Sequence, residues 1–225
     1  MADYVIATIK SWNIKSFEAL KDAMPKDSFH LITDPKELTM DKLKAIAPRY
    51  VFFPHWSWII SKDIYDNFEC VVFHATDLPF GRGGSPLQNL IVRGIYDTKI
   101  SAIKVSAGLD TGDVYLKHPI NISEGNADQL LTKISNIIYQ EMIPKIILEN
   151  PKPIPQTGEP VVFQRRTESQ SLIPRGLSGR RLYDYIRMLD GEGYPPAYME
   201  EHGQRIYFRN ANLMDDHVTA EAYFE

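Results

Sequence analysis

One histidine in this sequence stands where its side chain can take part in chemistry. His74 ends the apolar run Cys70-Val71-Val72-Phe73, which places it at the carboxyl end of a predicted strand. The glycine-rich segment 81–84 follows, and glycines permit close approach of the backbone to a ligand. Ser85 and Pro86 then predict a helix start, with Ser85 as N-cap and backbone amides placed to hold an anionic or carbonyl oxygen. The alternative is a structural turn beside a solvent-facing histidine.

A carboxylate lies on a second glycine-bounded turn. Asp110 stands between Gly108 and Gly112, within the segment 105–113. A carboxylate beside an imidazole favours the charged form of the ring and orients it. A turn of this kind is by itself usually a solvated loop. The functional interpretation therefore depends on the pair, with Asp110 approaching His74 from another part of the chain.

Alternating strands and helices are predicted to position these residues. In chain order they are a strand at 4–9, a helix at 12–24, a strand at 29–33, a helix at 35–47, a strand at 49–53, a helix at 62–67 and a strand at 70–74. This alternation predicts a Rossmann-like α/β fold, a mostly parallel sheet with helices on both faces. Ligands bind outside the carboxyl ends of such strands, so residues 10–13, 54–56 and 74 onward are expected at one edge.

The second half of the chain adds further elements and a predicted domain boundary. The pattern predicts a helix at 85–93, strands at 101–106 and 114–122, a long helix at 126–148, a helix at 180–189 and a hairpin of 197–201 and 204–209. Pro151, Pro153 and Pro155 interrupt regular structure and indicate a linker. We therefore expect a catalytic core of residues 1–155 and a small C-terminal α+β subdomain of residues 156–225.

The two glycine-bounded segments together resemble the formyltransferase family that uses N10-formyltetrahydrofolate. The family pattern is a histidine followed by Ser/Thr-x-Leu-Pro, a glycine-containing turn, Ser/Ala-Pro and, later, Leu-Asp-x-Gly. This chain is similar to it at His74, Thr76-Asp77-Leu78-Pro79, Gly83-Gly84-Ser85-Pro86 and Leu109-Asp110-Thr111-Gly112. The resemblance covers residues 1–150 well and the tail loosely. It implies an enzyme that moves a formyl group from the folate to an amine.

The resemblance also implies roles for individual residues. His74 would stabilise a tetrahedral oxyanion and help to move a proton, and Asp110 would set the charge of His74 and handle protons through a water. The residues expected to bind the folate are Trp56, Trp58, Val105, Ser106, Ala107, Gly108, Leu109 and Asp110.

One position departs from the family pattern. The family has an asparagine two residues before the histidine, where this chain has Val72, whose side chain cannot donate a hydrogen bond to the formyl oxygen. Removing one such donor costs on the order of 10²–10³ in rate. We expect Thr76, as a third catalytic residue, or a backbone amide near Gly83 and Gly84 to replace it. The other alternative is a relative that has lost activity.

Several segments resemble those of sugar-nucleotide formyltransferases, and this resemblance implies an amino sugar linked to a nucleotide, such as a precursor of the pseudaminic-acid type, as the acceptor. Lys10 is placed to pair with a pyrophosphate and Trp12 to stack on a base or sugar. The segment 163–167 resembles the arginine-bearing segment of sugar-nucleotide formyltransferases. The residues expected to bind this acceptor are Lys10, Ser11, Trp12, Arg82, Gly83, Gly84, Gln88, Arg165 and Arg166. The alternatives are an enzyme acting on methionyl-tRNA or a ribonucleotide, and an inert relative that binds folate or nucleotide.

Composition and charge set the expectations for partners. The 225 residues carry a formal net charge of −4, whereas proteins that grip tRNA usually present a basic face. We therefore expect small-molecule partners, no nucleic acid and no membrane, with a homodimer left open. The sequence lacks a signal-peptide pattern and an apolar run of about 20 residues, so a cytoplasmic protein is expected. Cys70 is the only cysteine, which excludes an internal disulfide, and no metal site is predicted.

Overall fold

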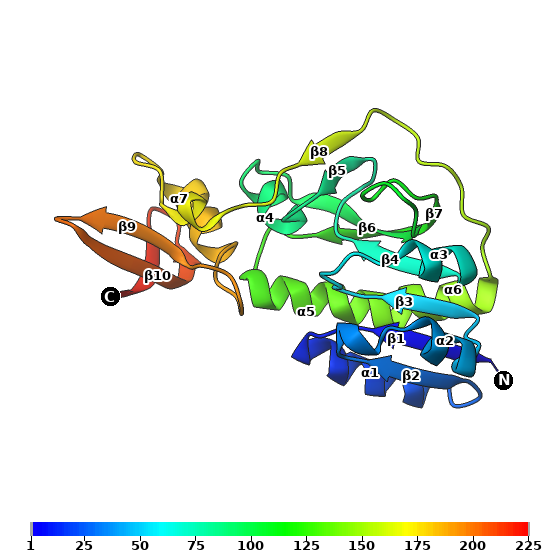
Figure 1. Cartoon of the computed structure of the whole chain (residues 1–225). Coiled ribbons are helices and arrows are strands. Elements are labelled where there is room, and N and C mark those ends of the chain that lie inside the picture. Colours follow the sequence, from blue (N-terminus) through cyan, green and yellow to red (C-terminus); the bar gives the residue numbers. More distant parts are fainter. Residues whose placement is uncertain (1, 225) are drawn as a thin grey trace. The chain divides into compact units, whose positions relative to one another are not determined.

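A six-stranded, mostly parallel sheet organises the first part of the molecule. The computed structural model describes residues 2–224. The sheet has the order β2-β1-β3-β4-β6-β7 (Figure 1), and its strands are β1 (Asp3–Ala7), β2 (Ser28–Ile32), β3 (Tyr50–Phe53), β4 (Cys70–His74), β6 (Asp97–Lys104) and β7 (Val114–Asn121). The first four strands run parallel, and β6 is antiparallel to β4. The predicted Rossmann-like α/β architecture is confirmed.

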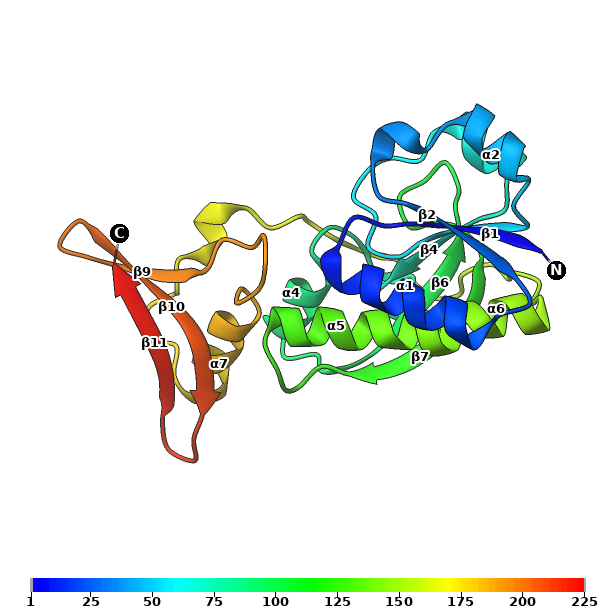
Figure 2. The ribbon, with the colours of Figure 1, turned by 90° about the horizontal axis from the view of Figure 1, so that it is seen from below.

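Helices cover both faces of this sheet. One face packs against α2 (Met40–Ile46) and α3 (Lys62–Asn67), whose Leu43 and Ile64 join Val5, Val51 and Phe53 in a buried cluster. On the other face, α1 (Ser11–Ala23) lies beside the long helix formed by α5 (Ala127–Ile137), a π-helical turn (Ile138–Met142) and α6 (Ile143–Glu149), as Figure 2 shows. The strands β1 and β3 are buried along nearly their whole length, which explains their continuous apolar runs.

The chain divides into two compact units, each built from segments that are distant in sequence. Unit 1 comprises Met1–Arg82, Lys99–Pro119 and Thr132–Val161, and unit 2 comprises Gly83–Thr98, Ile120–Leu131 and Val162–Glu225. Whether residues 1–155 and 156–225 form separate domains stays a prediction. Within residues 2–224, no helix is both long and apolar enough to cross a lipid bilayer.

Unit 2 is built around a three-stranded antiparallel sheet. Its strands are β9 (Ala197–Glu201), β10 (Gln204–Leu213) and β11 (Val218–Phe224), and α7 (Gly179–Arg187) contacts β10. Arg187 is buried, and its guanidinium donates to Asp184 Oδ1 at 2.7 Å and to the Gly125 and Ile122 carbonyl oxygens. A buried guanidinium needs such partners, because an unpaired buried charge is costly.

Some elements differ from the sequence-based expectation. The predicted helix at 35–47 is a 3₁₀ turn (Pro35–Glu37) followed by α2, because the Thr39 hydroxyl accepts from Lys42 N at 3.2 Å and caps a new helix. The predicted long helix at 126–148 contains the π-helical turn. Three strands were not predicted: β5 (Phe80–Gly83), β8 (Val161–Phe163) and β11, which are short or carry a weak alternation. The predicted hairpin of β9 and β10 is present.

Candidate functional site

His74 is held in one orientation at the carboxyl end of β4. It is buried, and its Nε2 lies 2.7 Å from the carbonyl oxygen of Gly81. A carbonyl oxygen only accepts hydrogen bonds, so Nε2 carries the proton. Nδ1 faces the Asp110 carboxylate, with 3.6 Å between Nδ1 and Oδ2. The nitrogen that is free to exchange a proton is therefore Nδ1, on the side of the carboxylate.

The loop that carries Asp110 folds back along β4 to reach His74. It begins beside Cys70, where Val105 N donates to the Cys70 carbonyl oxygen at 2.9 Å. The Asp110 backbone has a φ of 52°, in the left-handed region. Gly112 then approaches the preceding strand so closely that an added Cβ would lie 1.7 Å from Lys104 O. The glycine is required by this contact rather than by flexibility.

Gln156 connects this loop to Arg82. Its Nε2 donates to the carbonyl oxygens of Asp110 and Gly112, both at 2.8 Å. Its Oε1 accepts from Arg82 Nε at 3.1 Å and from Nη2 at 2.7 Å. Arg82, expected to bind substrate, is thus engaged with Gln156. Sequence reasoning missed Gln156 because it lies in the proline-rich segment interpreted as a linker, and no local pattern marks it.

Thr76 and Val72 occupy the positions that the family pattern makes important. Thr76 is fully buried, and its hydroxyl donates to Gly81 O at 3.4 Å, the same carbonyl that His74 contacts. Val72 packs against the apolar cluster of Leu78 and its neighbours. Its side chain therefore fills core space, and the catalytic role of Thr76 stays a prediction.

The loops after β1 and β3 lie at the edge where His74 lies. Strands β1, β3 and β4 are adjacent and parallel, so their carboxyl ends share one edge, as expected. Lys10 Nζ lies 5.2 Å from the centroid of the Trp12 ring, while Ser11, the first residue of α1, is exposed. The Trp56 and Trp58 rings lie 5.1 Å apart, with 45% of Trp58 exposed.

The residues expected to contact the folate include half-buried and exposed side chains. Val105 and Trp56 pack against the same core cluster, and Ser106, Ala107, Gly108 and Leu109 are exposed. Leu109 is 71% exposed despite its apolar side chain. Trp56 Nε1 is buried and has no hydrogen-bond partner among the described residues. An orphaned indole N–H beside exposed apolar side chains suits a flat ligand with polar edges.

The other residues expected to bind substrate belong to unit 2, where most have structural contacts. Gly84 N donates to Phe163 O at 3.1 Å, Gln88 is 2% exposed and donates to Met188 O at 3.3 Å, and Arg165 is exposed. Arg166 donates to Tyr185 Oη at 3.3 Å. Gly83 has a φ of 101°, and a Cβ there would lie 2.4 Å from Phe163 O.

Ser85 is the N-cap residue of the helix that begins at Pro86, as predicted, but it does not cap that helix through its side chain. Ser85 precedes α4 (Pro86–Ile91) with a φ of 51°, and its side chain makes no capping hydrogen bond. Its hydroxyl accepts from Arg166 N at 3.1 Å instead. With Gly84 N bonded to Phe163 O, the amides at this short helix are partly used by the protein itself.

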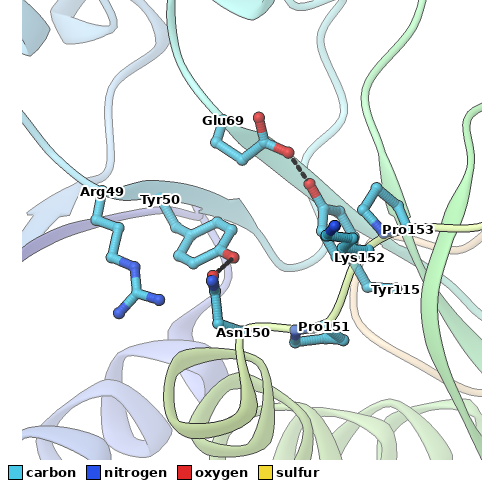
Figure 3. Close-up of a pocket in the computed structure, with 8 residues that line it drawn as sticks. All are labelled: Arg49, Tyr50, Glu69, Tyr115, Asn150, Pro151, Lys152 and Pro153. Atoms are coloured by element: carbon cyan, nitrogen blue, oxygen red, sulfur yellow. Dashed lines mark hydrogen bonds between the residues drawn. The ribbon is translucent and has the colours of Figure 1, made fainter.

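A cavity of about 290 Å³ lies at the amino-terminal edge of β3 and β4, away from the edge with His74 (Figure 3). It is lined by Arg49, Tyr50, Glu69, Tyr115, Asn150, Pro151, Lys152 and Pro153. Tyr50 Oη donates to Asn150 Oδ1 at 2.8 Å, and Tyr115 Oη donates to Glu69. Burial raises the pKa of both tyrosines, so they stay protonated at neutral pH. The bond from Tyr50 ties Asn150 to the sheet.

Two further chemistries are limited by the side chains present. Burial raises the pKa of the Cys70 thiol to about 12, so at neutral pH it is a protonated core side chain rather than a nucleophile. Among residues 2–224, no group of three or more His, Cys, Asp or Glu side chains is placed to hold a metal ion. The catalytic roles of His74 and Asp110 stay a prediction.

The known proteins similar to this chain include methionyl-tRNA formyltransferases. A solved structure named methionyl-tRNA formyltransferase, from Clostridium thermocellum, is 49% identical, with a TM-score of 0.95 over 100% of this chain and 99% of that one. This chain belongs to the formyltransferase family. A family model described as "Methionyl-tRNA formyltransferase, C-terminal domain" matches residues 168–225. The predicted membership in a folate-dependent enzyme family that uses N10-formyltetrahydrofolate is confirmed.

More distant relatives agree with this family. The methionyl-tRNA formyltransferase of Clostridium botulinum is 29% identical over 90% of this chain and 66% of its own length. The chain spans about half to two thirds of the curated relatives it matches. A 4-N formyltransferase from Francisella tularensis has a TM-score of 0.74 at 14% identity, over 95% of this chain and 98% of that one, and shows the fold alone.

Two expectations are corrected by these relatives. The sugar-nucleotide acceptor is wrong, because the relatives with substantial identity are named methionyl-tRNA formyltransferases, whereas the sugar enzymes share only the fold at 14–15% identity. The expected absence of a nucleic-acid partner is wrong for the same reason. A net charge of −4 describes the whole surface rather than one face.

Proposed function

We propose that this chain transfers the formyl group of N10-formyltetrahydrofolate to the amino group of methionyl-tRNA. The observation that carries the proposal is the buried His74 with the half-buried Asp110 3.6 Å away, in a chain 49% identical over its whole length to a structure named methionyl-tRNA formyltransferase. The pair supplies a proton acceptor and a fixed negative charge, which a transfer between two nitrogen atoms needs.

The reaction removes one proton from the amino group of the acceptor and adds one proton to N10 of the folate. The amino nitrogen forms a bond to the formyl carbon and loses a proton, and N10 of the folate gains a proton as its bond to that carbon breaks. His74 Nδ1 accepts the first proton, since Nε2–H is held by Gly81 O. The resulting imidazolium lies between a carbonyl oxygen and the Asp110 carboxylate, which both stabilise its charge.

The same imidazolium then stabilises the oxyanion and protonates the leaving nitrogen. Its Nδ1–H is a charged donor for the oxyanion that develops on the formyl oxygen, and it returns the proton towards N10. The Asp110 carboxylate keeps the ring oriented, because its Oδ2 lies 3.6 Å from Nδ1. This arrangement places oxyanion stabilisation on His74, because Val72 supplies no donor.

The folate would lie against the loops after β3 and β6. Trp56, Trp58 and Leu109 offer apolar faces to the pterin ring, and the backbone of residues 105–110 offers polar groups to its edge. The orphaned Trp56 Nε1–H and the exposed fractions of Trp58 and Leu109, 45% and 71%, support this placement. Ring burial against such side chains is favourable by roughly 25 cal/mol per Å² of apolar surface.

A direct assay tests the proposal. The purified chain is incubated with N10-formyltetrahydrofolate and methionyl-tRNA, and N-formylmethionine is measured after release from the tRNA. We expect turnover in the wild type and its near-complete loss in His74→Ala and Asp110→Ala, with unfolding temperatures showing that both variants fold. Uncharged tRNA and free methionine serve as controls for the acceptor. Absence of product, or variants with wild-type turnover, would contradict the proposal.

A further inference from the structure

A buried amide joins the loops after β1 and β3. Asn13 is fully buried, and its Nδ2 lies 2.7 Å from Thr8 Oγ1, 3.3 Å from Pro54 O and 3.2 Å from His55 Nδ1. Its Oδ1 accepts from Ser135 Oγ at 2.6 Å. All of these groups belong to unit 1. The amide therefore has partners on both of its ends, and its side chain is fixed between α1, α5 and the β3 loop.

This arrangement determines which nitrogen of His55 carries the proton. Pro54 O only accepts, so the Asn13 NH₂ group must face it, and the same NH₂ group faces His55 Nδ1. His55 Nδ1 is then an acceptor, and the proton is on Nε2. Burial and the charge of Lys10 lower the pKa of His55 to about 4, so the ring is neutral at physiological pH. His55 is therefore a neutral ring with an N–H donor at Nε2.

Two further donors lie next to this ring. The Trp12 ring has Lys10 Nζ 5.2 Å from its centroid and the His55 ring edge-on at 6.3 Å. Trp12 Nε1 is buried and has no acceptor within residues 2–224. A buried N–H without a partner costs free energy, so its acceptor comes from outside the chain. The cluster of Lys10, Trp12 and His55 presents one cation and two N–H groups, which suits an anionic oxygen.

We propose that Lys10, Trp12 and His55 bind an anionic oxygen group of a substrate, and that Asn13 positions His55 as the neutral donor of this subsite. The assignment rests on the proposed function for the identity of the substrates. A phosphodiester of the acceptor tRNA and a carboxylate of the folate share this chemistry. The subsite lies at the carboxyl edge of β1 and β3, and β3 is the strand next to β4, which carries His74.

Steady-state kinetics with two variants, each of which lacks one donor group, test the subsite. Trp12→Phe keeps the aromatic ring and removes the N–H, and Lys10→Met removes the charge and keeps most of the chain length. We expect the KM for one substrate to rise about tenfold in each variant, as loss of a hydrogen bond to a charged group does. The substrate whose KM rises identifies the source of the anion. Lys15→Met, on the exposed side of α1, is the matched control. Unchanged KM values for both substrates would overturn the proposal.

The role of Asn13 is tested separately by Asn13→Asp. A carboxylate replaces the NH₂ group opposite His55 Nδ1, so the ring must then carry a proton on Nδ1. We expect ¹⁵N NMR to show the Nε2–H form of His55 in the wild type and an Nδ1-protonated ring in Asn13→Asp, with a higher KM for the same substrate as in Trp12→Phe. An Nδ1–H form in the wild type would overturn the positioning role.

A binding experiment separates this proposal from the proposed function. The indole N–H signal of Trp12, identified by its loss in Trp12→Phe, is followed while inorganic phosphate or 5-formyltetrahydrofolate is added. We expect it to shift with at least one of them in the wild type and not in Lys10→Met. If the signal shifts but methionyl-tRNA is not formylated, the subsite stands and the proposed function fails. If the signal shifts with neither probe, the subsite fails whatever the turnover.

Discussion

At the scale of single residues, the orientation of His74 decides what the site can do. Gly81 O holds Nε2–H at 2.7 Å, so only Nδ1 changes its protonation during a reaction. Asp110 faces that nitrogen from a loop with left-handed backbone, and Gln156 holds the same loop by its carbonyl groups. Catalysis should thus depend on both the Asp110 charge and the Gln156 amide, with the larger effect on kcat coming from the charge.

The Asp110 charge is tested by Asp110→Asn, which keeps the shape of the side chain. The imidazolium loses its counter-charge, so proton transfer slows, while substrate contacts remain. We expect kcat to fall about 100-fold or more, within the range for general acid–base groups, with KM changed less than about threefold. Asp113 lies in the same loop and contributes a backbone carbonyl oxygen, which accepts from Lys104 N. Asp113→Asn keeps this bond, so it is the control and should retain turnover. A large rise in KM with unchanged kcat would show that Asp110 binds substrate instead.

The Gln156 amide is tested by Gln156→Glu. The carboxylate still accepts from Arg82 but can no longer donate to the carbonyl oxygens of Asp110 and Gly112, and it repels both. The loop should therefore move Asp110 relative to His74, and we expect kcat to fall about tenfold, equivalent to ~1.4 kcal/mol. Gln140→Glu, on an exposed position of the π-helical turn, controls for the added charge. Equal turnover in both variants would contradict a positioning role.

The residues that sequence could reveal are those with a local pattern. His74 and Asp110 stand in motifs whose spacing can be read along the chain. Gln156, Asn13 and His55 have no such signal, because their roles arise from partners 40 or more positions away, as in the bonds from Gln156 to Asp110 and from Asn13 to His55. Side-chain hydrogen bonds across a fold leave no periodicity, so these residues needed the structure.

At the scale of elements, the sheet was predictable and the path of the loop 105–113 was not. Strands buried on both faces give continuous apolar runs, which identify β1 to β4 and their shared edge. The loop between β6 and β7 instead returns along β4, from Cys70 to His74. Nothing in hydrophobic periodicity encodes that return. The contact that enforces it is the approach of Gly112 to Lys104 O.

This contact predicts the effect of Gly112→Ala. A Cβ 1.7 Å from Lys104 O cannot be accommodated, so the loop must shift and Asp110 with it. We expect a loss of about 2 kcal/mol or more in the free energy of unfolding, a Tm lower by roughly 4–8 °C, and a large loss of turnover. The control is Gly203→Ala in the β9–β10 turn, where φ is 81° and no atom lies within 4 Å of the added Cβ. It should cost only about 1–2 kcal/mol and keep turnover. A Gly112→Ala protein with wild-type kcat would contradict the proposed role of the loop.

At the scale of the whole molecule, bulk properties predicted the class of protein but not its partner. Ordinary composition and alternating elements indicate an α/β enzyme fold. The net charge of −4 led to the wrong expectation about nucleic acid, because binding depends on the local field rather than on the sum of charges. The family model over residues 168–225 shows that the short tail is itself a recognised domain type. Its antiparallel sheet gave only a weak sequence signal through β9 and β10.

The whole molecule should also show a stability that depends on pH through His55. Its folded-state pKa is about 4 against an ordinary value of 6.5, so between these values the unfolded chain binds more protons than the folded one. Stability therefore rises with pH across this window, and it is lost as the pH falls from 6.5 towards 4. A shift of this size corresponds to about 3 kcal/mol. We expect urea unfolding at pH 4 to 7.5 to show a smaller loss in His55→Gln, which stays neutral throughout and can still accept from Asn13. Equal slopes for the two proteins would mean that His55 titrates normally in the fold, and the neutral donor assigned to it would then be absent at mildly acidic pH.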